Sequence, residues 1–378
     1  MIPVFKPKMN KECILQGLNS ILTSGEIGIG QRTQEFENRF AEYIGTRYAL
    51  ALNSCTAALH LACLATGIGP GDEVIVPSLS FVSTALAPLY CGATPVFADV
   101  DEETLCVDPR DIHRKISPRT KAVIPVHFGG HACQMDEIMM LADEHGLHVI
   151  EDAAHACGAK YRGTMLGSIG SVGCFSFHRV KCLTTGDGGM ITTNDEELYQ
   201  GVKKLRWLGI DTGADSSMPS TSYPGQYAVE TLGFKYHMND ISAVIGLAQL
   251  EVLEEQIAIR RKWAAKYDSV LQEHGWISRP VEREYATSTR YNYIVKVPMR
   301  NELCEHLRAR GIETLVHYEP AHHFGVFGAA QREASLPVTE HVWTRLLTLP
   351  LFPDLTPDDF HTVTREILAF GAERGLGM

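Results

Sequence analysis

The N-terminal part of the chain alternates short apolar runs with segments whose apolar residues recur every three or four positions. Runs such as Glu73–Pro77 (EVIVP) and His148–Asp152 (HVIED) have the length and composition of buried strands. Elsewhere the pattern is helical, because Phe36, Phe40 and Ile44 recur at i, i+4 and i+8 before Gly45 ends the stripe. Strands that alternate with helices predict βαβ units and a mostly parallel sheet covered on both faces.

The same pattern places the elements along the chain. We expect strands at Tyr48–Leu52, Glu73–Pro77, Pro95–Asp99, Lys121–Pro125, His148–Asp152, Cys174–Phe177 and Gly189–Thr193. We expect helices at Cys55–Ala65, Phe81–Cys91, Asp108–Ile116 and Asp136–His145. The segment Asp211–Gln226 is rich in Ser, Gly, Pro and Thr, which predicts a loop excursion.

A second domain is expected after this excursion. Asn239 can cap a long helix whose face carries Ile241, Val244, Ala248 and Val252, and this helix would lead into the second domain. Beyond it, Tyr291–Val297 is strand-like and Glu302–Arg310 is an amphipathic helix. The prediction is therefore an α/β fold with a large domain at residues 1–255 and a smaller α+β domain at residues 256–378.

Composition and charge narrow the class of protein. The 378 residues include 45 acidic and 34 basic side chains, a net charge of −11, which argues against a nucleic-acid or anionic-membrane surface. The ten cysteines form no C-x-x-C pair, as is typical of a reducing compartment. The N-terminus has no apolar signal region, and the uncharged stretch Val74–Ala98 contains Pro77, Pro88 and Pro95. We therefore expect a cytoplasmic protein without membrane spans.

Polar residues follow several predicted strands, where ligands of open α/β sheets bind. Asn53–Ala58 opens a helix, so its backbone amides could hold a phosphate, although a plain N-cap is the more common explanation of such a motif taken alone. Asp152 ends its strand and could hold a protonated ring nitrogen or a metal ion, with His155 three residues on. A capping Asp and a satisfied His are the alternative.

Lys181 follows the strand-like run Cys174–Phe177 and precedes the glycine-rich turn Gly186-Asp187-Gly188-Gly189. A surface lysine is the ordinary interpretation, but a sheltered lysine can form a Schiff base. Lys181 lies 29 residues after Asp152, and both follow strands. A lysine for the aldehyde together with an Asp for the pyridinium nitrogen is typical of a pyridoxal phosphate site.

At this point the sequence resembles the DegT/StrS sugar aminotransferases, of the fold-type I aspartate aminotransferase superfamily, over nearly the whole chain. The resemblance is carried by Gly25–Gly30, Glu35–Glu37, Asn53–His60, Gly71–Pro77, Glu151–His155, Ser176–His178, Lys181, Gly186–Met190, Gly233–Asp240 and Gln249-Leu250. It implies a three-layer α/β/α large domain, pyridoxal 5'-phosphate as cofactor, and an active site at the interface of a homodimer.

The resemblance also implies a role for each matched residue. Lys181 would form the Schiff base and shuttle protons, Asp152 would pair with the pyridine nitrogen, and His155 would contact the phenolic oxygen of the cofactor. Phe81 would stack on the ring. Thr56, the amide of Ala57 and Ser176 would hold the phosphate, and Lys235 would reach it from the neighbouring subunit. The segment containing His317, Tyr318 and His322 matches one that lines the sugar site, although a surface turn explains it equally well.

By this resemblance L-glutamate donates the amino group and a nucleotide-linked keto-sugar, often a 4-keto-6-deoxyhexose, accepts it, leaving pyridoxamine phosphate between the half-reactions. An acidic chain needs local cations for such anionic substrates, and the candidates are Arg179, Lys203, Lys204, Arg206 and Lys235. For the run from Lys203 to Arg206, a solvated helix face is the more ordinary interpretation.

Three alternatives stay open. A keto-cyclitol aminotransferase would differ only in its acceptor pocket. A dehydratase branch of the family replaces the lysine by histidine, so the presence of Lys181 favours transamination. A non-catalytic regulatory protein on the same fold is the third, because fold alone does not give function. No metal is expected, because His127 with His131 and His155 with Cys157 lack any accompanying ligand motif.

Overall fold

The computed structural model describes residues 1–210, 228–229, 231–328 and 334–376. Its centre is a seven-stranded sheet in the order β1-β9-β8-β5-β4-β2-β3. β9 runs antiparallel to β1 and β8, and the other neighbouring strands are parallel. The strands are β1 (Tyr48–Leu52), β2 (Glu73–Pro77), β3 (Thr94–Ala98), β4 (Thr120–Val123), β5 (His148–Asp152), β8 (Val172–Ser176) and β9 (Gly189–Thr193).

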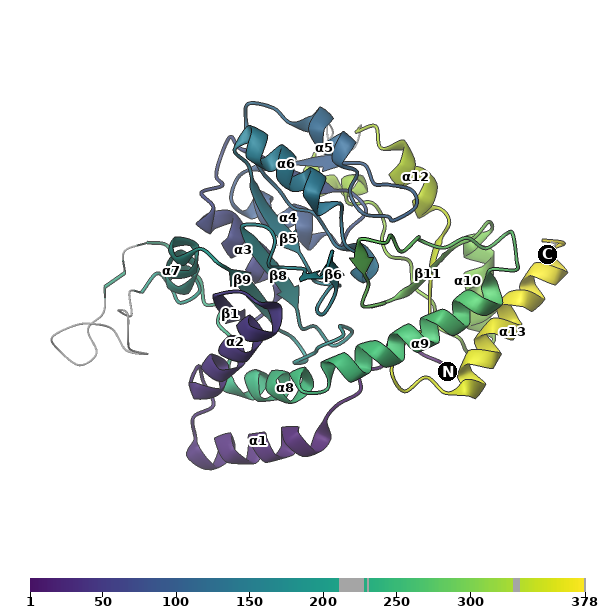
Figure 1. Ribbon diagram of the computed structural model, residues 1–378, viewed down its shortest axis with the longest axis horizontal. Helices are drawn as coiled ribbons and strands as arrows, with labels where there is room; N and C mark the ends of the chain where they lie inside the picture. Colours follow the sequence, from purple (N-terminus) through teal and green to yellow (C-terminus); the bar gives the residue numbers. More distant parts are fainter. Residues whose placement is uncertain (211–227, 230, 329–333, 377–378) are drawn as a thin grey trace.

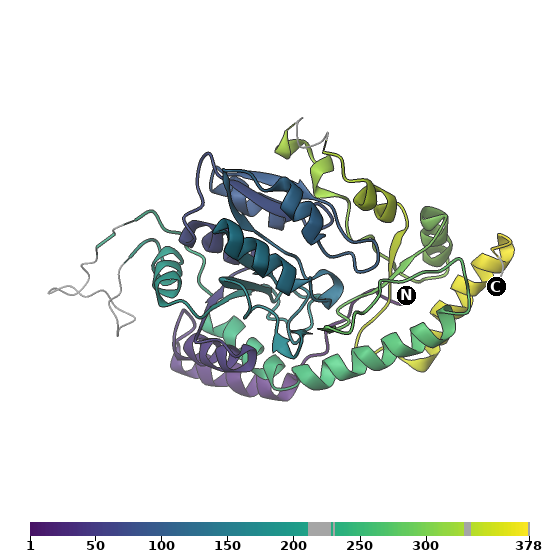
Figure 2. The same ribbon diagram turned by 45° about the horizontal axis from the view of Figure 1, so that its top comes forward.

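Helices cover both faces of this sheet (Figures 1 and 2). One face packs against α3 (Cys55–Ala65), α4 (Ser83–Tyr90) and α7 (Glu196–Leu205), and the other against α2 (Gln31–Ile44), α5 (Pro109–Lys115), α6 (Met135–His145) and α8 (Asp240–Leu250). Side chains alternate along a strand, so Val74 and Val76 enter one core while Ile75 enters the other. Burial on both faces explains why these strands are continuously apolar.

The C-terminal part builds a third core around a two-stranded sheet, β11 (Tyr293–Lys296) paired antiparallel with β12 (Leu346–Leu349). Three helices supply the rest of this core: α9 (Leu253–Leu271), α10 (Arg300–Ala309) and α13 (Pro357–Glu373). The remaining elements are α1 (Lys11–Ser24), β6 (Lys160–Tyr161), β7 (Thr164–Met165), β10 (Ala286–Thr287), α12 (Pro337–Trp343) and the short 3-10 helices η1 (Phe128–Gly130), η2 (Ala321–His323) and η3 (Gly325–Phe327).

The fold class and the order of the elements agree with the sequence prediction. The strand ranges predicted for β1, β2, β5 and β9 match, and other ends differ by one or two residues because hydrogen bonding defines them. The Pro and Gly residues of the stretch 74–98 separate β2, α4 and β3, as expected. The excursion predicted at Asp211–Gln226 lies wholly within 211–227, outside the described residues.

The helix predicted after Asn239 is wrong in its length. Asn239 does cap α8, because its Oδ1 accepts a hydrogen bond from the amide of Ser242 at 2.9 Å. The helix then ends at Leu250, and α9 begins at Leu253, so Val252 lies in the break rather than on a common face. Ile241 is exposed rather than buried, and Val244 and Ala248 carry the predicted face.

The predicted domain boundary at 255/256 stays a prediction. Segments from each side of this boundary pair or pack with the part of the chain on the other side. β10, from the C-terminal part, pairs with β6, and the N-terminal Ile2 pairs with Ile312. Ala321 and Leu336 lie in the core beside α3 and α4. Within the described residues, no helix is both long and apolar enough to cross a membrane.

Candidate active site

The carboxyl ends of β5 and β8 bring Asp152 and Lys181 into one site. Asp152 is the last residue of β5 and is paired with Cys174 of β8, while Lys181 lies in the turn between β8 and β9. Burial lowers the pKa of Lys181 to about 8, although the charge of Asp152 opposes this shift. A lysine with this pKa holds a far larger share of unprotonated amine at neutral pH than a surface lysine does.

Asp152 is held by two donors that fix the orientation of its carboxylate. Thr84 Oγ1 donates to Asp152 Oδ2 at 2.7 Å, and the amide of Ala154 donates to Oδ1 at 3.2 Å. Ser80 Oγ in turn lies 2.8 Å from Thr84 Oγ1. Burial raises the pKa of Asp152, whereas these hydrogen bonds lower it. The sequence analysis missed Thr84 and Ser80, although Ser80 follows the carboxyl end of β2 and the strand-end rule could have indicated it.

His155 contacts Tyr318 across the site. Its Nδ1 accepts a hydrogen bond from the amide of Gly129 at 3.3 Å, so the neutral ring carries its proton on Nε2. Nε2 lies 2.9 Å from the Tyr318 hydroxyl and donates to it. Burial, assisted by the nearby charge of Lys181, holds the pKa of His155 well below its usual value. His155 is therefore a neutral hydrogen-bond donor, and its contact with a cofactor oxygen stays a prediction.

Tyr291 lies beneath this group, and the sequence analysis placed it only in a core strand. Its ring stacks on that of His155 with the centroids 4.5 Å apart, and Lys181 Nζ lies 4.6 Å from the Tyr291 centroid. Nothing in the local pattern around Tyr291 indicates this position, because its partners lie more than 100 residues away in the sequence.

The predicted phosphate site lies at the N-terminus of α3 and differs in one detail from the expectation. Ser54 caps the helix, and its Oγ accepts the amide of Ala57 at 3.1 Å, so that amide already has a partner. The first intrahelical bond runs from the amide of Ala58 to the carbonyl of Ser54, which leaves the amides of Cys55 and Thr56 ahead of it. A cavity that is open to solvent adjoins this end, lined in part by Thr56, Ala57, Asp187 and Tyr236.

The other predicted cofactor contacts, Ser176, Phe81 and Lys235, are not among the residues that line this cavity. Ser176 is buried at the end of β8, and its Oγ accepts the amide of His178 at 3.4 Å. Phe81 is 56% exposed, and its ring centroid lies 5.9 Å from that of Tyr318. Lys235 is exposed, and its carbonyl accepts from Asn53 Nδ2 at 3.5 Å, so its backbone borders the start of α3 in its own chain. The subunit that receives its amine stays a prediction.

One predicted substrate cation is wrong. Arg206 is buried and bonds to Glu37, and its guanidinium also donates to the carbonyl of Ala51 at 3.0 Å. Its charge is therefore used inside the fold, and neither an anion site nor a solvated helix face describes it. Lys203 lies over the ring of Tyr199, at 5.9 Å from Nζ to the centroid, on the same helix.

The three residues predicted for the sugar site have different surroundings. Tyr318 contacts His155, as described above. His317 is buried beside it with Nδ1 2.7 Å from Thr348 Oγ1, and burial lowers its pKa to about 3. His322 instead has Nδ1 2.6 Å from Ser78 Oγ and Nε2 2.9 Å from Glu340. Both ring nitrogens of His322 thus have partners outside the group of Lys181, Asp152 and His155.

Comparison with known proteins agrees with this geometry. The sequence profile of the DegT/DnrJ/EryC1/StrS aminotransferase family matches residues 8–368. The chain belongs to this family. It is an aminotransferase, so the non-catalytic alternative is set aside.

Individual relatives match along nearly their whole length. The chain is 40% identical to the spore coat polysaccharide biosynthesis protein SpsC of Bacillus subtilis, over 97% of this chain and 96% of that protein. The aminotransferase TlmJ of Streptoalloteichus hindustanus superposes with a TM-score of 0.93 at 36% identity, covering 99% of this chain and all of TlmJ. The candidate sugar aminotransferase Spr1654 of Streptococcus pneumoniae, solved in PMP and PLP forms, gives TM-scores of 0.92 and 0.89 at 29% and 27% identity. The PMP form covers 99% of this chain and 100% of that one, the PLP form 99% and 98%.

The residues present fit the cofactor of this family. Pyridoxal phosphate requires an amine for its aldehyde, an acid for its ring nitrogen and donors for its phosphate. The structure offers the amine of Lys181 with its lowered pKa, the oriented carboxylate of Asp152 and the open amides at the start of α3. Among the described residues, no lysine or arginine forms an ion pair with the buried Asp152, although the charge of Lys181 acts on its carboxylate.

Proposed function

We propose that this protein is a sugar aminotransferase that uses pyridoxal phosphate to transfer the amino group of L-glutamate to a keto-sugar. The observation that carries the proposal is the placement of Lys181, with its lowered pKa, beside the buried carboxylate of Asp152 at the ends of β8 and β5. Burial penalises the charge of each side chain, so neither position stabilises the fold by itself. A role in catalysis explains why both groups are buried here.

The lysine supplies the proton transfers of the proposed reaction. Pyridoxal phosphate, when bound, withdraws the electrons left on the donor's α-carbon after its C–H bond breaks. The Lys181 amine would take the proton from that carbon and deliver it to the C4′ carbon of the cofactor. A pKa of about 8 suits this work, since an acid–base group is most effective when its pKa is near the working pH.

The second contribution is the electrostatic field of Asp152. Thr84 and the amide of Ala154 hold the carboxylate in one orientation, so it can keep a proton on the ring nitrogen without reorganising. His155 would contact the phenolic oxygen of the cofactor, in exchange for its present contact with Tyr318. The cofactor phosphate would sit against the amides of Cys55 and Thr56, with Ser176 nearby, and Lys235 of a second subunit would add a cation.

The acceptor is proposed from the chemistry of relatives and of the chain. SpsC takes part in polysaccharide biosynthesis, and Spr1654 is a candidate sugar aminotransferase. We propose a nucleotide-linked keto-sugar, such as a 4-keto-6-deoxyhexose, as the acceptor and a cytoplasmic homodimer as the active form. With Arg206 used inside the fold, Arg179, Lys203, Lys204 and Lys235 remain the candidates for contacts to the diphosphate.

The test is the visible spectrum of the purified protein during a titration with pyridoxal phosphate, then L-glutamate, then keto-sugars. We expect a yellow band that glutamate bleaches and that a keto-sugar, but not a keto-cyclitol, restores. The rate of band formation should rise with pH through about 8 rather than near 10, where an ordinary lysine deprotonates.

Matched variants separate the site from general effects. Lys181→Ala should give no band, whereas Lys262→Ala, on the exposed face of α9, should behave as the unaltered protein. Absence of the band in the unaltered protein would overturn the proposal, and a band unaffected by Lys181→Ala would overturn the role of that lysine. If only a keto-cyclitol restored the yellow band, the acceptor would be a keto-cyclitol rather than a keto-sugar.

A further inference from the structure

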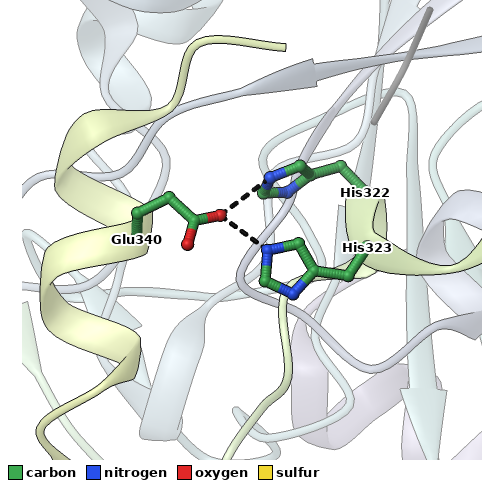
Figure 3. A group of neighbouring side chains, drawn as sticks. All are labelled: His322, His323 and Glu340. Atoms are coloured by element: carbon green, nitrogen blue, oxygen red, sulfur yellow. Dashed lines mark hydrogen bonds and ion pairs between the residues drawn. The ribbon is translucent and has the colours of Figure 1, made fainter. Parts of the chain in front are cut away.

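Three side chains outside the proposed active site converge on one point. His322 and His323 lie in η2, and Glu340 lies in α12 (Figure 3). The Nε2 atoms of the two imidazoles lie 2.9 and 2.7 Å from the same carboxylate oxygen of Glu340. One ligand atom from each residue falls within 4.8 Å of the others.

The outer nitrogens of both rings also have partners. His322 Nδ1 lies 2.6 Å from Ser78 Oγ, and His323 Nδ1 lies 3.8 Å from a carboxylate oxygen of Glu319. Metal-binding histidines usually donate their second N–H to such an oxygen, which fixes the ring and turns its other lone pair toward the ion. Ser78 Oγ can donate or accept, so His322 can adopt the tautomer with the proton on Nδ1 without losing this contact.

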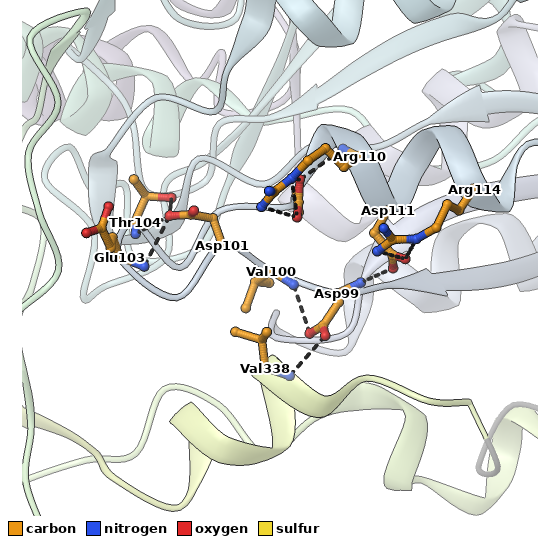
Figure 4. A network of polar contacts seen from close by, with 10 residues as sticks. Asp99, Val100, Asp101, Glu103, Thr104, Arg110, Asp111, Arg114 and Val338 are labelled. Atoms are coloured by element: carbon orange, nitrogen blue, oxygen red, sulfur yellow. Dashed lines mark hydrogen bonds and ion pairs between the residues drawn. The ribbon is translucent and has the colours of Figure 1, made fainter.

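The two elements that carry the group are anchored before any ligand binds. Asp99, which follows β3, accepts the amide of Val338 at 3.0 Å (Figure 4). It also accepts the amide of Thr339 at 2.7 Å, and so holds the first turn of α12. On the other side, the amide of Ala321 donates to the carbonyl of Ser78 at 2.8 Å and holds η2. The site therefore has ligands on short elements whose positions are set by the large sheet.

Burial differs among the three ligands in a way that suits a partly open site. The His322 side chain is 3% exposed, that of His323 is 27% exposed and that of Glu340 is 42% exposed. Phe97 and Trp343 flank the two rings at centroid distances of 6.1 and 5.0 Å. An ion here would be surrounded by apolar groups on one side and would meet water on the other.

We propose that His322, His323 and Glu340 bind a divalent transition-metal ion of the zinc class. Two imidazole nitrogens and one carboxylate oxygen are a ligand set that zinc accepts, with water as the fourth ligand. Tetrahedral bonds of about 2.0–2.2 Å place neighbouring ligand atoms roughly 3.3 Å apart. Glu340 would withdraw by about half an ångström to reach this spacing, and its partial exposure leaves room for that movement.

Such an ion would brace the substrate side of the active site. It would join η2 to α12, and η2 follows directly on the segment that carries Tyr318, the partner of His155. No metal is expected from the sequence, and His323 and Glu340, which stand 17 residues apart, match no ligand motif that could have indicated this site. The inference is independent of the proposed function.

The experiment measures zinc binding by the untagged full-length holoenzyme after dialysis against a chelator. Calorimetry and elemental analysis should give one Zn²⁺ per chain, and Zn²⁺ should raise Tm. Glu340→Gln keeps the shape of the side chain and should lower the affinity by at least about tenfold. His323→Ala should abolish stoichiometric binding.

His341→Ala is the matched control, since this exposed histidine lies on the same helix, one residue after Glu340, and points to Glu102 at 3.9 Å. It should bind zinc as the unaltered protein does. Circular dichroism of the metal-free variants checks folding, and cobalt substitution gives an independent absorption signature of tetrahedral nitrogen and oxygen ligands. No binding by the folded unaltered protein, or equal binding by Glu340→Gln and His323→Ala, would overturn the site.

Discussion

Burial alters the chemistry of individual side chains here, and the hydrogen-bond partners decide in which direction. Glu151 and Asp152 are adjacent in sequence and both are buried, but their pKa values move in opposite directions. Burial alone would raise the pKa of Glu151, but hydrogen bonds from His127 and the amides of Gly167 and Gly170 lower it. Asp152 receives fewer hydrogen bonds, so burial raises its pKa. Glu151 stabilises the fold, and Asp152 retains capacity for a ligand.

Thr84 is expected to control the ionisation of Asp152. Thr84→Val removes the hydrogen bond to Oδ2, which stabilises the charged carboxylate, so the pKa of Asp152 should rise further. Activity, if it needs the carboxylate, should then fail at a higher pH on the acid side, and kcat should drop by about tenfold. The measurement is the pH profile of kcat for Thr84→Val and Thr84→Ser.

Thr84→Ser retains the hydroxyl and should keep the original profile. Asp152→Asn removes the charge altogether and should give the largest effect. We expect turnover to fall by at least about 10²-fold while some cofactor stays bound through the phosphate contacts. An unchanged profile in Thr84→Val would show that this hydrogen bond does not tune Asp152.

At the scale of elements, side chains at strand ends orient helices that come much later in the chain. Asp99 is the clearest case, because it receives the amides of Val338 and Thr339 and also the hydroxyl of Thr339. This contact spans about 240 residues and takes the place of a local N-cap on α12, where Leu336 provides none. The position of α12, and with it of Glu340, depends on β3.

Asp99→Ala should therefore destabilise the protein by about 2 kcal/mol, since the amides at the start of α12 lose their acceptor. Urea unfolding followed by circular dichroism measures this change. Thr339→Val, which removes one of the three contacts, is the control and should cost roughly half as much. Equal stability of Asp99→Ala and the unaltered protein would contradict this role.

At the scale of the whole molecule, the proposed homodimer would complete the site with groups from a second copy of the chain. The cavity at the start of α3 is open, and Lys235 is exposed at its border rather than directed to any described acid. Leu232 and Phe81 are also exposed, at 83% and 56%, on segments near the site. Contacts from a second subunit would cover such groups.

Mixed dimers test this arrangement. If Lys235 acts on the partner's site, a dimer of one Lys181→Ala chain and one Lys235→Ala chain contains one intact site and one doubly altered site. After random mixing of the two inactive proteins at low cofactor concentration, activity should recover to roughly a quarter of that of the unaltered protein. If Lys235 acts within its own chain, mixing should restore nothing. Light scattering checks that the mixed species is a dimer.

Much of this protein can be predicted from the sequence, because the deciding interactions are local or periodic. Apolar periodicity predicts the strands and helices of the large sheet, and side chains at strand ends indicate the pair Asp152 and Lys181. These predictions succeed because parallel strands have their carboxyl ends at the same edge of the sheet, whichever segments connect the strands along the chain. The motifs also place the chain in its family.

Tertiary structure decides what depends on contacts between distant segments. Three contacts of this kind shape the active site: those of Tyr291 with Lys181, Thr84 with Asp152 and Tyr318 with His155. Two others are the ion pair that keeps Arg206 inside the fold and the contact of His322 with Glu340. Hydrophobic burial depends on the type of residue and therefore leaves a pattern in the sequence. The partner of a buried polar group depends on which segments the fold brings within about 3 Å, and no local pattern records that distance.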